Sequence, residues 1–174
     1  MSDPATQPQG DHDVWICDFG DAEDRASFAR LMAEFAAEPV SGSPHLDVAH
    51  FGRVADDLAR RAGTLVLLGA RAESEQTEGV LIAFEGYSSF ARGQLFNVHD
   101  VHVSPSARGD GLGTAMLEVL ADLGREHRFA KITLEVAASN SGAIRLYRRL
   151  GYTGLDGLPA TAPAGVTYFA TRKL

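Results

Sequence analysis

The sequence predicts a mixed α/β domain with a mostly antiparallel sheet and one parallel crossover, and three observations support this class. Apolar strand segments and amphipathic helical stretches alternate along the chain in the order β-α-α-β-β-β-α-β-α-β. Three consecutive strand segments, at 64–71, 79–87 and 95–103, favour an antiparallel meander. The strand–helix–strand unit over residues 96–136 favours a right-handed crossover between parallel strands.

The first half of the chain predicts a tail, a strand, two helices and a hairpin. Residues 1–12 are rich in Pro, Gln, Gly and Asp, so we expect a disordered tail followed by a single domain over 13–174. A strand is expected at 14–19, and Asp21 or Asp24 is expected to cap the following helix. That helix carries an apolar stripe formed by Phe28, Leu31, Met32 and Phe35. After the loop at 39–44 a second amphipathic stretch ends at Gly63, and strands 64–71 and 79–87 form the hairpin.

The second half predicts two strand–helix pairs and a final strand. The strand at 95–103 leads through a glycine-rich turn into a helix over 112–126, and residues 131–136 form the next strand. Ser139 or Asn140 is expected to cap a helix that ends near Leu150, with Gly151 at the position where a left-handed backbone is needed. The last strand is expected at 167–171.

Composition narrows the possible partners. Sixteen Lys and Arg stand against 23 Asp and Glu, a net charge of −7, so no basic face is available and nucleic acid is not an expected partner. The single cysteine allows neither an internal disulfide nor a cysteine metal cluster, and we expect no metal. The apolar runs are too short to cross a bilayer and the N-terminus is acidic, so a cytoplasmic protein without membrane contact is expected.

The most informative segment is the turn between the strand at 95–103 and the helix at 112–126. Glycines stand at 109, 111 and 113, directly after Arg108. Glycine permits positive φ and close approach of a ligand to the backbone, and the N-terminus of the helix attracts anions. The segment therefore predicts a binding site for an anion such as a pyrophosphate, with Arg108 adding a charge-assisted contact.

A dinucleotide-binding turn is the competing interpretation of the same glycines. Gly109 and Gly111 begin that fingerprint, and Glu135 follows where a ribose-binding acid would stand. Threonine stands at 114, however, and five residues separate the strand from the first glycine. Only about 60 residues follow, too few for a doubly wound sheet with a substrate domain. A phosphate-binding loop of the Gly-Lys-Ser/Thr type is excluded because that sequence does not occur.

Two segments together resemble the GNAT N-acetyltransferase superfamily. Arg108-x-x-Gly111-x-Gly113 is similar to its acetyl-CoA signature. Residues 134–152 (LEVAASNSGAIRLYRRLGY) resemble its second block, with Asn140, Ala143, Tyr147 and Gly151-Tyr152 at the family's spacing. The resemblance implies a GNAT fold with a splayed acetyl-CoA cleft, acetyl-CoA as co-substrate and direct acetyl transfer to a primary amine of a small molecule. A homodimer is expected from the fold alone.

The resemblance also implies cofactor contacts and chemical roles for individual residues. The pyrophosphate would lie on backbone amides from Arg108 to Thr114, and the pantetheine arm would pair with the backbone at 101–103, where the Val103 N–H would stabilise the oxyanion. Tyr147 matches the position that protonates the departing thiolate, although its place on the helix also suits a core aromatic. Asn140 suits both a helix cap and a pantetheine contact. The expected cofactor-binding residues are Val101, Val103, Arg108, Gly109, Gly111, Gly113, Thr114, Asn140 and Tyr147.

The acceptor side is expected around acidic and histidine residues of the central strands. Asp100 ranks above His99 and Glu85 as base or amine-binding group, and all three are expected substrate contacts. In polyamine-acetylating relatives an acid at the position of Asp100 contacts the amine, whereas His99 departs from their acidic pattern. His99 and His102 are three apart on a strand and face opposite sides, which argues against a shared metal. A protein or peptide amine as acceptor and a non-catalytic acyl-CoA-binding module are the alternative functions.

Overall fold

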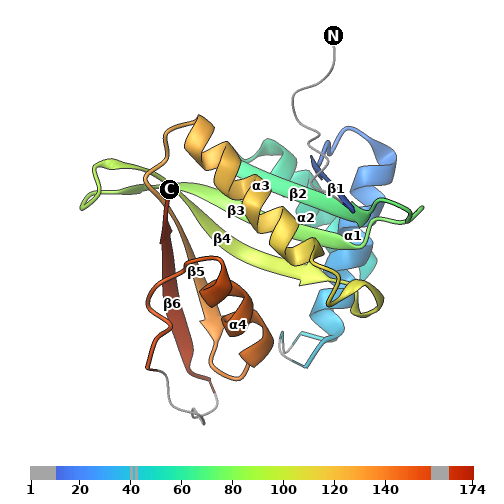
Figure 1. Ribbon diagram of the computed structural model, residues 1–174. Coiled ribbons are helices and arrows are strands. Elements are labelled where there is room, and N and C mark those ends of the chain that lie inside the picture. The colour runs from blue at the N-terminus through green and yellow to red at the C-terminus, as the bar shows by residue number, and fades with distance from the viewer. Residues whose placement is uncertain (1–10, 40, 42, 158–164) are drawn as a thin grey trace. The chain divides into compact units, whose positions relative to one another are not determined.

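A computed structural model describes residues 11–39, 41, 43–157 and 165–174 (Figure 1). The strands form one six-stranded sheet in the order β1-β2-β3-β4-β5-β6. β1 and β2 pair antiparallel, β4 and β5 pair parallel, and β5 and β6 pair antiparallel, so the predicted mixed α/β class is confirmed. The elements are β1 (His12–Ile16), α1 (Ala22–Ala37), α2 (Val48–Arg60), β2 (Thr64–Arg71), β3 (Gly79–Ser88), β4 (Gly93–Val103), η1 (Pro105–Ala107), α3 (Leu112–Glu126), β5 (Lys131–Ala137), α4 (Ser141–Arg149) and β6 (Thr167–Lys173).

The chain divides into two compact units. The first unit comprises the described residues of Met1–Ala83 together with Asp100–Val119. The second comprises Phe84–His99 and the described residues of Leu120–Leu174. The strands β3 and β4 and the helix α3 contribute residues to both units.

In the first unit, capping residues fix where the two N-terminal helices begin. Asp21 caps α1 by accepting hydrogen bonds from the backbone N–H groups of Glu23 and Asp24. Asp47 caps α2 by accepting from His50 N–H. α1 ends before Glu38, whose extended backbone is what a residue preceding proline favours. The prediction that Asp21 or Asp24 caps α1 is therefore resolved in favour of Asp21.

Close packing of α3 on the sheet explains two strand glycines of the first unit. A Cβ on Gly69 would lie 2.9 Å from a methyl carbon of Leu112, and a Cβ on Gly79 would lie 2.8 Å from the Met116 methyl group. Figure 1 shows α3 in front of β2 and β3, with α1 and α2 behind them. The first unit is therefore layered as helix, sheet and helices, and its fully buried side chains include Phe28, Leu31, Leu67, Leu68, Leu81, Leu112, Met116 and Leu117.

The second unit is built around β5 and α4. β5 pairs with β4 from Leu95↔Lys131 to Val98↔Leu134, and with β6 along its whole length. Asn140 caps α4 by accepting from Ala143 N–H. At the other end Gly151 has φ +80°, its N–H donates to Arg148 C=O, and Tyr152 N–H donates to Tyr147 C=O. These two bonds form a Schellman motif, which confirms the predicted left-handed glycine after the helix.

Three predicted boundaries are corrected by the structure. β1 covers His12–Ile16 rather than 14–19, because His12 pairs with Arg71 and the Asp11 carbonyl accepts from Ala72 N–H. His12, within the expected tail at 1–12, therefore pairs with Arg71 of β2, and residues 1–10 lie outside the described residues. Gly113 lies inside the first turn of α3 rather than in the preceding turn, since the helix begins at Leu112.

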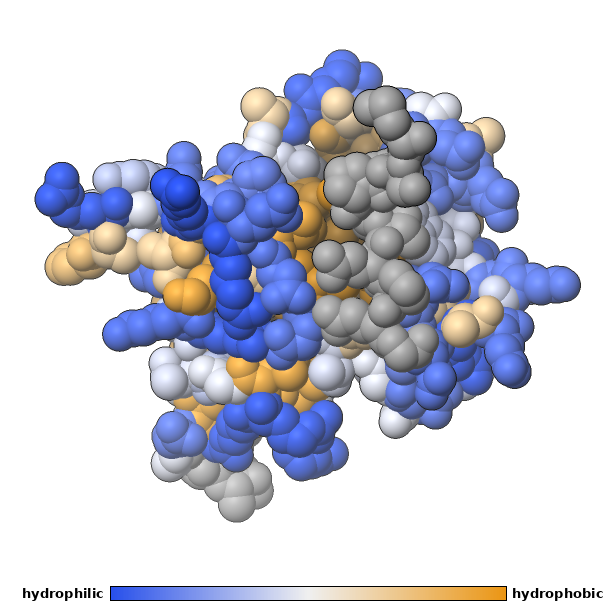
Figure 2. All heavy atoms as spheres, turned by 45° about the horizontal axis from the view of Figure 1, so that its top comes forward, coloured by the Kyte–Doolittle hydropathy of each residue, from blue (hydrophilic) through white to orange (hydrophobic). Residues whose placement is uncertain are grey.

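Within the described ranges, no helix is long and apolar enough to cross a membrane. Figure 2 shows one face on which hydrophilic side chains predominate, with smaller hydrophobic areas between them.

Candidate active site

The turn between β4 and α3 has the backbone geometry that its glycines predict. Gly109 and Gly111 adopt φ +93° and +100°, which other residues rarely adopt. A Cβ on Gly109 would meet nothing within 4 Å, so backbone conformation rather than packing requires glycine there. The turn leads directly into α3, where Gly113 and Thr114 occupy the first turn of the helix. The N–H groups of a first helical turn are the ones that bind anions.

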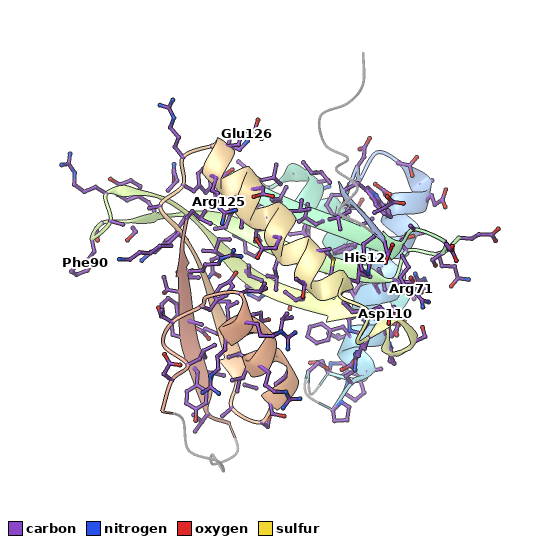
Figure 3. All side chains as sticks on the ribbon, in the orientation of Figure 1. His12, Arg71, Phe90, Asp110, Arg125 and Glu126 are labelled. Atoms are coloured by element: carbon purple, nitrogen blue, oxygen red, sulfur yellow. The ribbon has the colours of Figure 1, made fainter. Side chains whose placement is uncertain are left out.

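An ionic network attaches this turn to the β1–β2 end of the sheet. Arg71 donates through Nη2 to Glu78 at 2.6 Å and through Nη1 to Asp110 at 3.3 Å, and Asp110 lies between the two positive-φ glycines. A Cβ on Gly111 would lie 3.4 Å from the His12 ring. Figure 3 shows His12, Arg71 and Asp110 together at this place. We infer that Arg71 fixes the turn by holding Asp110.

A cavity of about 710 Å³ lies beside the same network. Its lining contains the carboxylates of Asp11, Glu73 and Asp110 and a single guanidinium, that of Arg71. The guanidinium already contacts Asp110 and Glu78, so this cavity offers little to an anion. Anion binding is better placed on the backbone amides of the turn.

Arg108 makes its contacts with the protein itself in this structure. Its Nε–H donates to the Val103 carbonyl at 2.8 Å, and its guanidinium pairs with the Glu38 carboxylate at the end of α1. The side chain is nevertheless 48% exposed. Arg108 is therefore bound to a partner that an incoming anion would have to replace.

Glu38 also contacts a buried histidine, which sequence reasoning did not assign to the site. His102, on β4, is 1% exposed in its side chain and stacks on the Phe35 ring at a centroid distance of 5.4 Å. Its Nδ1 lies 3.2 Å from Oε1 of Glu38, and its Nε2 lies 3.7 Å from Oε1 of Glu34. Burial lowers the pKa of His102 below its ordinary value, against the opposing effect of Glu34 and Glu38 and together with that of Arg108.

The sequence contains a weak signal for this group. Glu38 follows Leu31 and Phe35 at helical spacing, so a carboxylate extends the apolar stripe of α1. Glu34, one turn earlier, accepts a hydrogen bond from Ser104 Oγ at 2.9 Å although 70 residues separate the two. Helical periodicity places Glu34 and Glu38 on one face of the helix, but it does not predict which residues of other elements they contact.

In the second unit, Tyr147 and Asn140 both lie on α4. Tyr147 is 7% exposed and its ring contacts Tyr152 at a centroid distance of 5.5 Å. Burial raises the pKa of Tyr147 to about 12. The Asn140 side chain caps α4, which confirms one of the two roles expected for it.

The predicted site residues are divided between the two units. Glu85 and His99 are exposed, and the His99 ring contacts Phe84 at 5.6 Å. Asp100 is half-buried and lies two residues before His102, on the same side of β4. The first unit holds Asp100, Val101, Val103, Arg108, Gly109, Gly111, Gly113 and Thr114, and the second holds Glu85, His99, Asn140 and Tyr147.

Among the described residues, no group of three or more His, Cys, Asp or Glu side chains is arranged to hold a metal ion. His99 is exposed, whereas His102 is enclosed by α1.

Comparison with known proteins identifies relatives of this chain. Residues 28–152 match the model of the acetyltransferase (GNAT) family. A mycothiol acetyltransferase of Thermobispora bispora is 32% identical over 167 residues, covering 88% of this chain and 51% of that protein. A streptothricin acetyltransferase of Streptomyces lavendulae is 36% identical over 95 residues, covering 53% of this chain and 47% of that protein. The chain thus spans about half the length of these curated relatives.

Solved structures support the fold at lower sequence identity. A probable GNAT acetyltransferase of Chromobacterium violaceum has a TM-score of 0.70 at 16% identity, covering 99% of this chain and 93% of that one. A chain of the NatC complex, solved with a Gag peptide and CoA, has a TM-score of 0.69 at 15% identity, covering 95% of this chain and 99% of that one.

Proposed function

The chain belongs to the acetyltransferase (GNAT) family, and on that premise we propose that it transfers an acetyl group from acetyl-CoA directly to a primary amine of a small molecule. The observation that carries the proposal is the turn at 108–114. It combines two positive-φ glycines, the first turn of a helix and an arginine in one short segment. Acetyl-CoA supplies the activated acetyl group as a thioester, and the chain supplies binding, proton transfer and charge stabilisation.

The turn fits the pyrophosphate of acetyl-CoA. The space around Gly109 is open where a Cβ would stand, so phosphate oxygens can approach the backbone amides. Arg108 is proposed to exchange the Glu38 carboxylate for the pyrophosphate, which offers the guanidinium another anion. The proposed binding residues are Val101, Val103, Arg108, Gly109, Gly111, Gly113 and Thr114, with the Val103 N–H for the oxyanion.

Tyr147 is proposed to give the proton that the departing thiolate needs, and Asn140 is proposed to contact the pantetheine arm while it caps α4. A raised pKa keeps the Tyr147 phenol protonated through the neutral range, so the donor form is the populated form. Aromatic packing against Tyr152 fixes the direction of the ring.

The acceptor is proposed to contact Asp100, His99 and Glu85. Asp100 is the carboxylate nearest in sequence to the backbone segment 101–103 and keeps its proposed role as base or amine-binding group. A small-molecule acceptor is favoured because the streptothricin and mycothiol acetyltransferases are named for small molecules. A relative from Escherichia coli is named for an alanine of ribosomal protein bS18, so a peptide amine is the alternative acceptor.

A thermal-shift titration with acetyl-CoA, CoA, NAD and NADPH tests the cofactor. A ligand present at about 100 times its Kd adds about 2.7 kcal/mol to the free energy of unfolding, which raises Tm by several degrees. We expect stabilisation by acetyl-CoA and CoA and none by the nicotinamide nucleotides. Stabilisation by NAD or NADPH alone would overturn the proposal and restore Glu135 as a ribose ligand.

A thiol-release assay then tests the reaction against a panel of small amines and N-terminal peptides. Release of CoA thiol that depends on a small amine supports the proposed acceptor class. Release with peptides alone would replace the small molecule by a peptide amine. Binding of acetyl-CoA with no thiol release for any amine would favour the non-catalytic acyl-CoA-binding module.

A further inference from the structure

His102, Glu34 and Glu38 form a group in which two carboxylates lie beside a buried imidazole. Neither helix capping nor packing of the hydrophobic core explains why these carboxylates are there. The imidazole lies between two carboxylates of α1, one near each ring nitrogen. Arg108 contacts Glu38 from the turn after β4, and Ser104 and Arg30 contact Glu34. All of these residues belong to the first unit.

The two ring nitrogens differ in what they face. Glu38 is the nearer carboxylate, at 3.2 Å from Nδ1, so in the neutral imidazole the proton belongs on Nδ1. The lone pair then lies on Nε2, which is buried and makes no hydrogen bond to any described residue. Oε1 of Glu34 is 3.7 Å away, too far for a hydrogen bond, and it is also an acceptor.

Nε2 of His102 and Oε1 of Glu34 are both acceptors, and a group that carries several N–H donors could bond to both. A primary ammonium has three such donors and a positive charge, which suits a carboxylate beside a neutral imidazole. The side chains of Glu34 and Glu38 are 31% and 23% exposed, whereas that of His102 is 1% exposed. A cation arriving from solvent therefore meets the Glu34 carboxylate before the ring.

We propose that Glu34 receives the ammonium group of the acceptor and that His102 takes up its proton through Glu34. One N–H bond of the ammonium breaks, and its electron pair stays on nitrogen as the nucleophilic lone pair. The proton passes to the Glu34 carboxylate, and once substrate binding closes the 3.7 Å gap between Oε1 and Nε2 to hydrogen-bond distance it passes on to Nε2. The imidazolium that forms is held by Glu38, and Glu34 returns to its anion. Of these two residues, Glu34 touches the substrate, and His102 is a positioning residue that acts through Glu34.

Proton uptake by His102 depends on the two carboxylates, because Glu34 and Glu38 favour the imidazolium against the burial that lowers the pKa of the ring. Asp100 lies on the same side of β4 as His102 and keeps the role of binding the amine. This inference rests on the proposed function, since it assigns the acceptor side of the same reaction. The same inference gives Arg108 a second role besides binding the pyrophosphate. When its guanidinium exchanges Glu38 for the pyrophosphate, the Glu38 carboxylate becomes available to stabilise the imidazolium.

Kinetics of matched variants test the proposal with an amine that the wild type acetylates. Glu34→Gln keeps the shape of the side chain and a carbonyl that accepts from Ser104, and His102→Gln removes the imidazole. We expect kcat to fall about 10²-fold or more in each, with loss of the acid limb of the pH–rate profile and unchanged affinity for CoA. Glu23→Gln, an exposed acid in the first turn of α1, is the control and should keep the wild-type profile.

The outcome that overturns the proposal is a Glu34→Gln enzyme with wild-type kcat and pH profile. Glu34 is partly exposed, so this variant is informative even if His102→Gln does not fold.

A second measurement keeps this inference separate from the proposed function. In the CoA-loaded protein with nitrogen-15-labelled histidine, NMR reports the tautomer and titration of His102. We expect lone-pair Nε2 signals that shift on adding propylamine but not 1-butanol, its neutral counterpart, and no such shift in Glu34→Gln. An identical propylamine shift in wild type and Glu34→Gln would exclude the ammonium site. Failure of every amine in the thiol assay would refute the proposed function instead.

Discussion

Removing the hydroxyl of Tyr147 tests both its burial and its proposed chemistry. Tyr147→Phe keeps the aromatic ring that contacts Tyr152 and deletes only the titrating group. Burial raises the pKa of this phenol from 10.0 to about 12 in the folded chain. The folded state therefore holds the proton more tightly than the unfolded state, so this contribution to stability is complete below pH 10 and is lost as pH rises toward 12.

The expected magnitude follows from the two pKa values. A difference of about two units corresponds to about 2.7 kcal/mol in the limit, and at pH 11 the loss relative to pH 8 is about 1.4 kcal/mol. Urea denaturation of the wild type and of Tyr147→Phe at pH 8 and pH 11 measures this loss. The difference in unfolding free energy between the two proteins at pH 11 is compared with the same difference at pH 8, which gives a double difference. The buried Cys17 thiol, whose pKa burial raises to about 12, titrates equally in both proteins and cancels.

The result that refutes the reasoning is a double difference below about 0.3 kcal/mol, which is within the error of additivity. Such a result would mean that the Tyr147 phenol is not buried away from water in the folded protein. The rate provides an independent reading, since loss of a proton donor is expected to lower kcat by about 10²-fold or more. A wild-type rate in Tyr147→Phe would remove the proposed role while leaving the stability argument intact.

Three further predictions concern the glycines, the arginine and the cap. Gly154→Ala should destabilise the protein more than Gly109→Ala, by about 1–3 kcal/mol in urea denaturation. Both glycines have positive φ, but only at Gly154 would a Cβ lie 2.5 Å from the Phe169 carbonyl oxygen. Equal losses of stability in the two variants would contradict this prediction. Arg108→Gln should raise the Kd for CoA about 10-fold or more in calorimetry, since it removes a charge-assisted contact, and an unchanged Kd would exclude the pyrophosphate contact. Asn140→Ala should cost about 1 kcal/mol of stability from the lost cap, and a weaker affinity for CoA in addition would support its second role, whereas wild-type affinity would limit Asn140 to capping.

Local sequence patterns were sufficient to predict most helices and strands, and also the part of the candidate site formed by the glycine turn and the last helix. The stripe of Phe28, Leu31 and Phe35 predicts α1 because burial at helical spacing is a property of neighbouring residues. Gly151 and the glycines after Arg108 reveal their backbone conformation because few other residues adopt positive φ. The turn at 108–114 and the helix at 141–149 could therefore be located, and the family assigned, from the chain alone.

The surroundings of His102 depend on packing that no local pattern encodes. Glu34 and Glu38 reach the ring only because α1 lies against the end of β4, about 70 residues further along the chain. The start of β1 at His12 likewise depends on pairing with Arg71 in β2. The sequence by itself determined the elements and the glycine turn, since these follow from spacing and backbone preference. Only the tertiary structure decided which carboxylates enclose the buried imidazole, because that contact exists only once distant segments pack together.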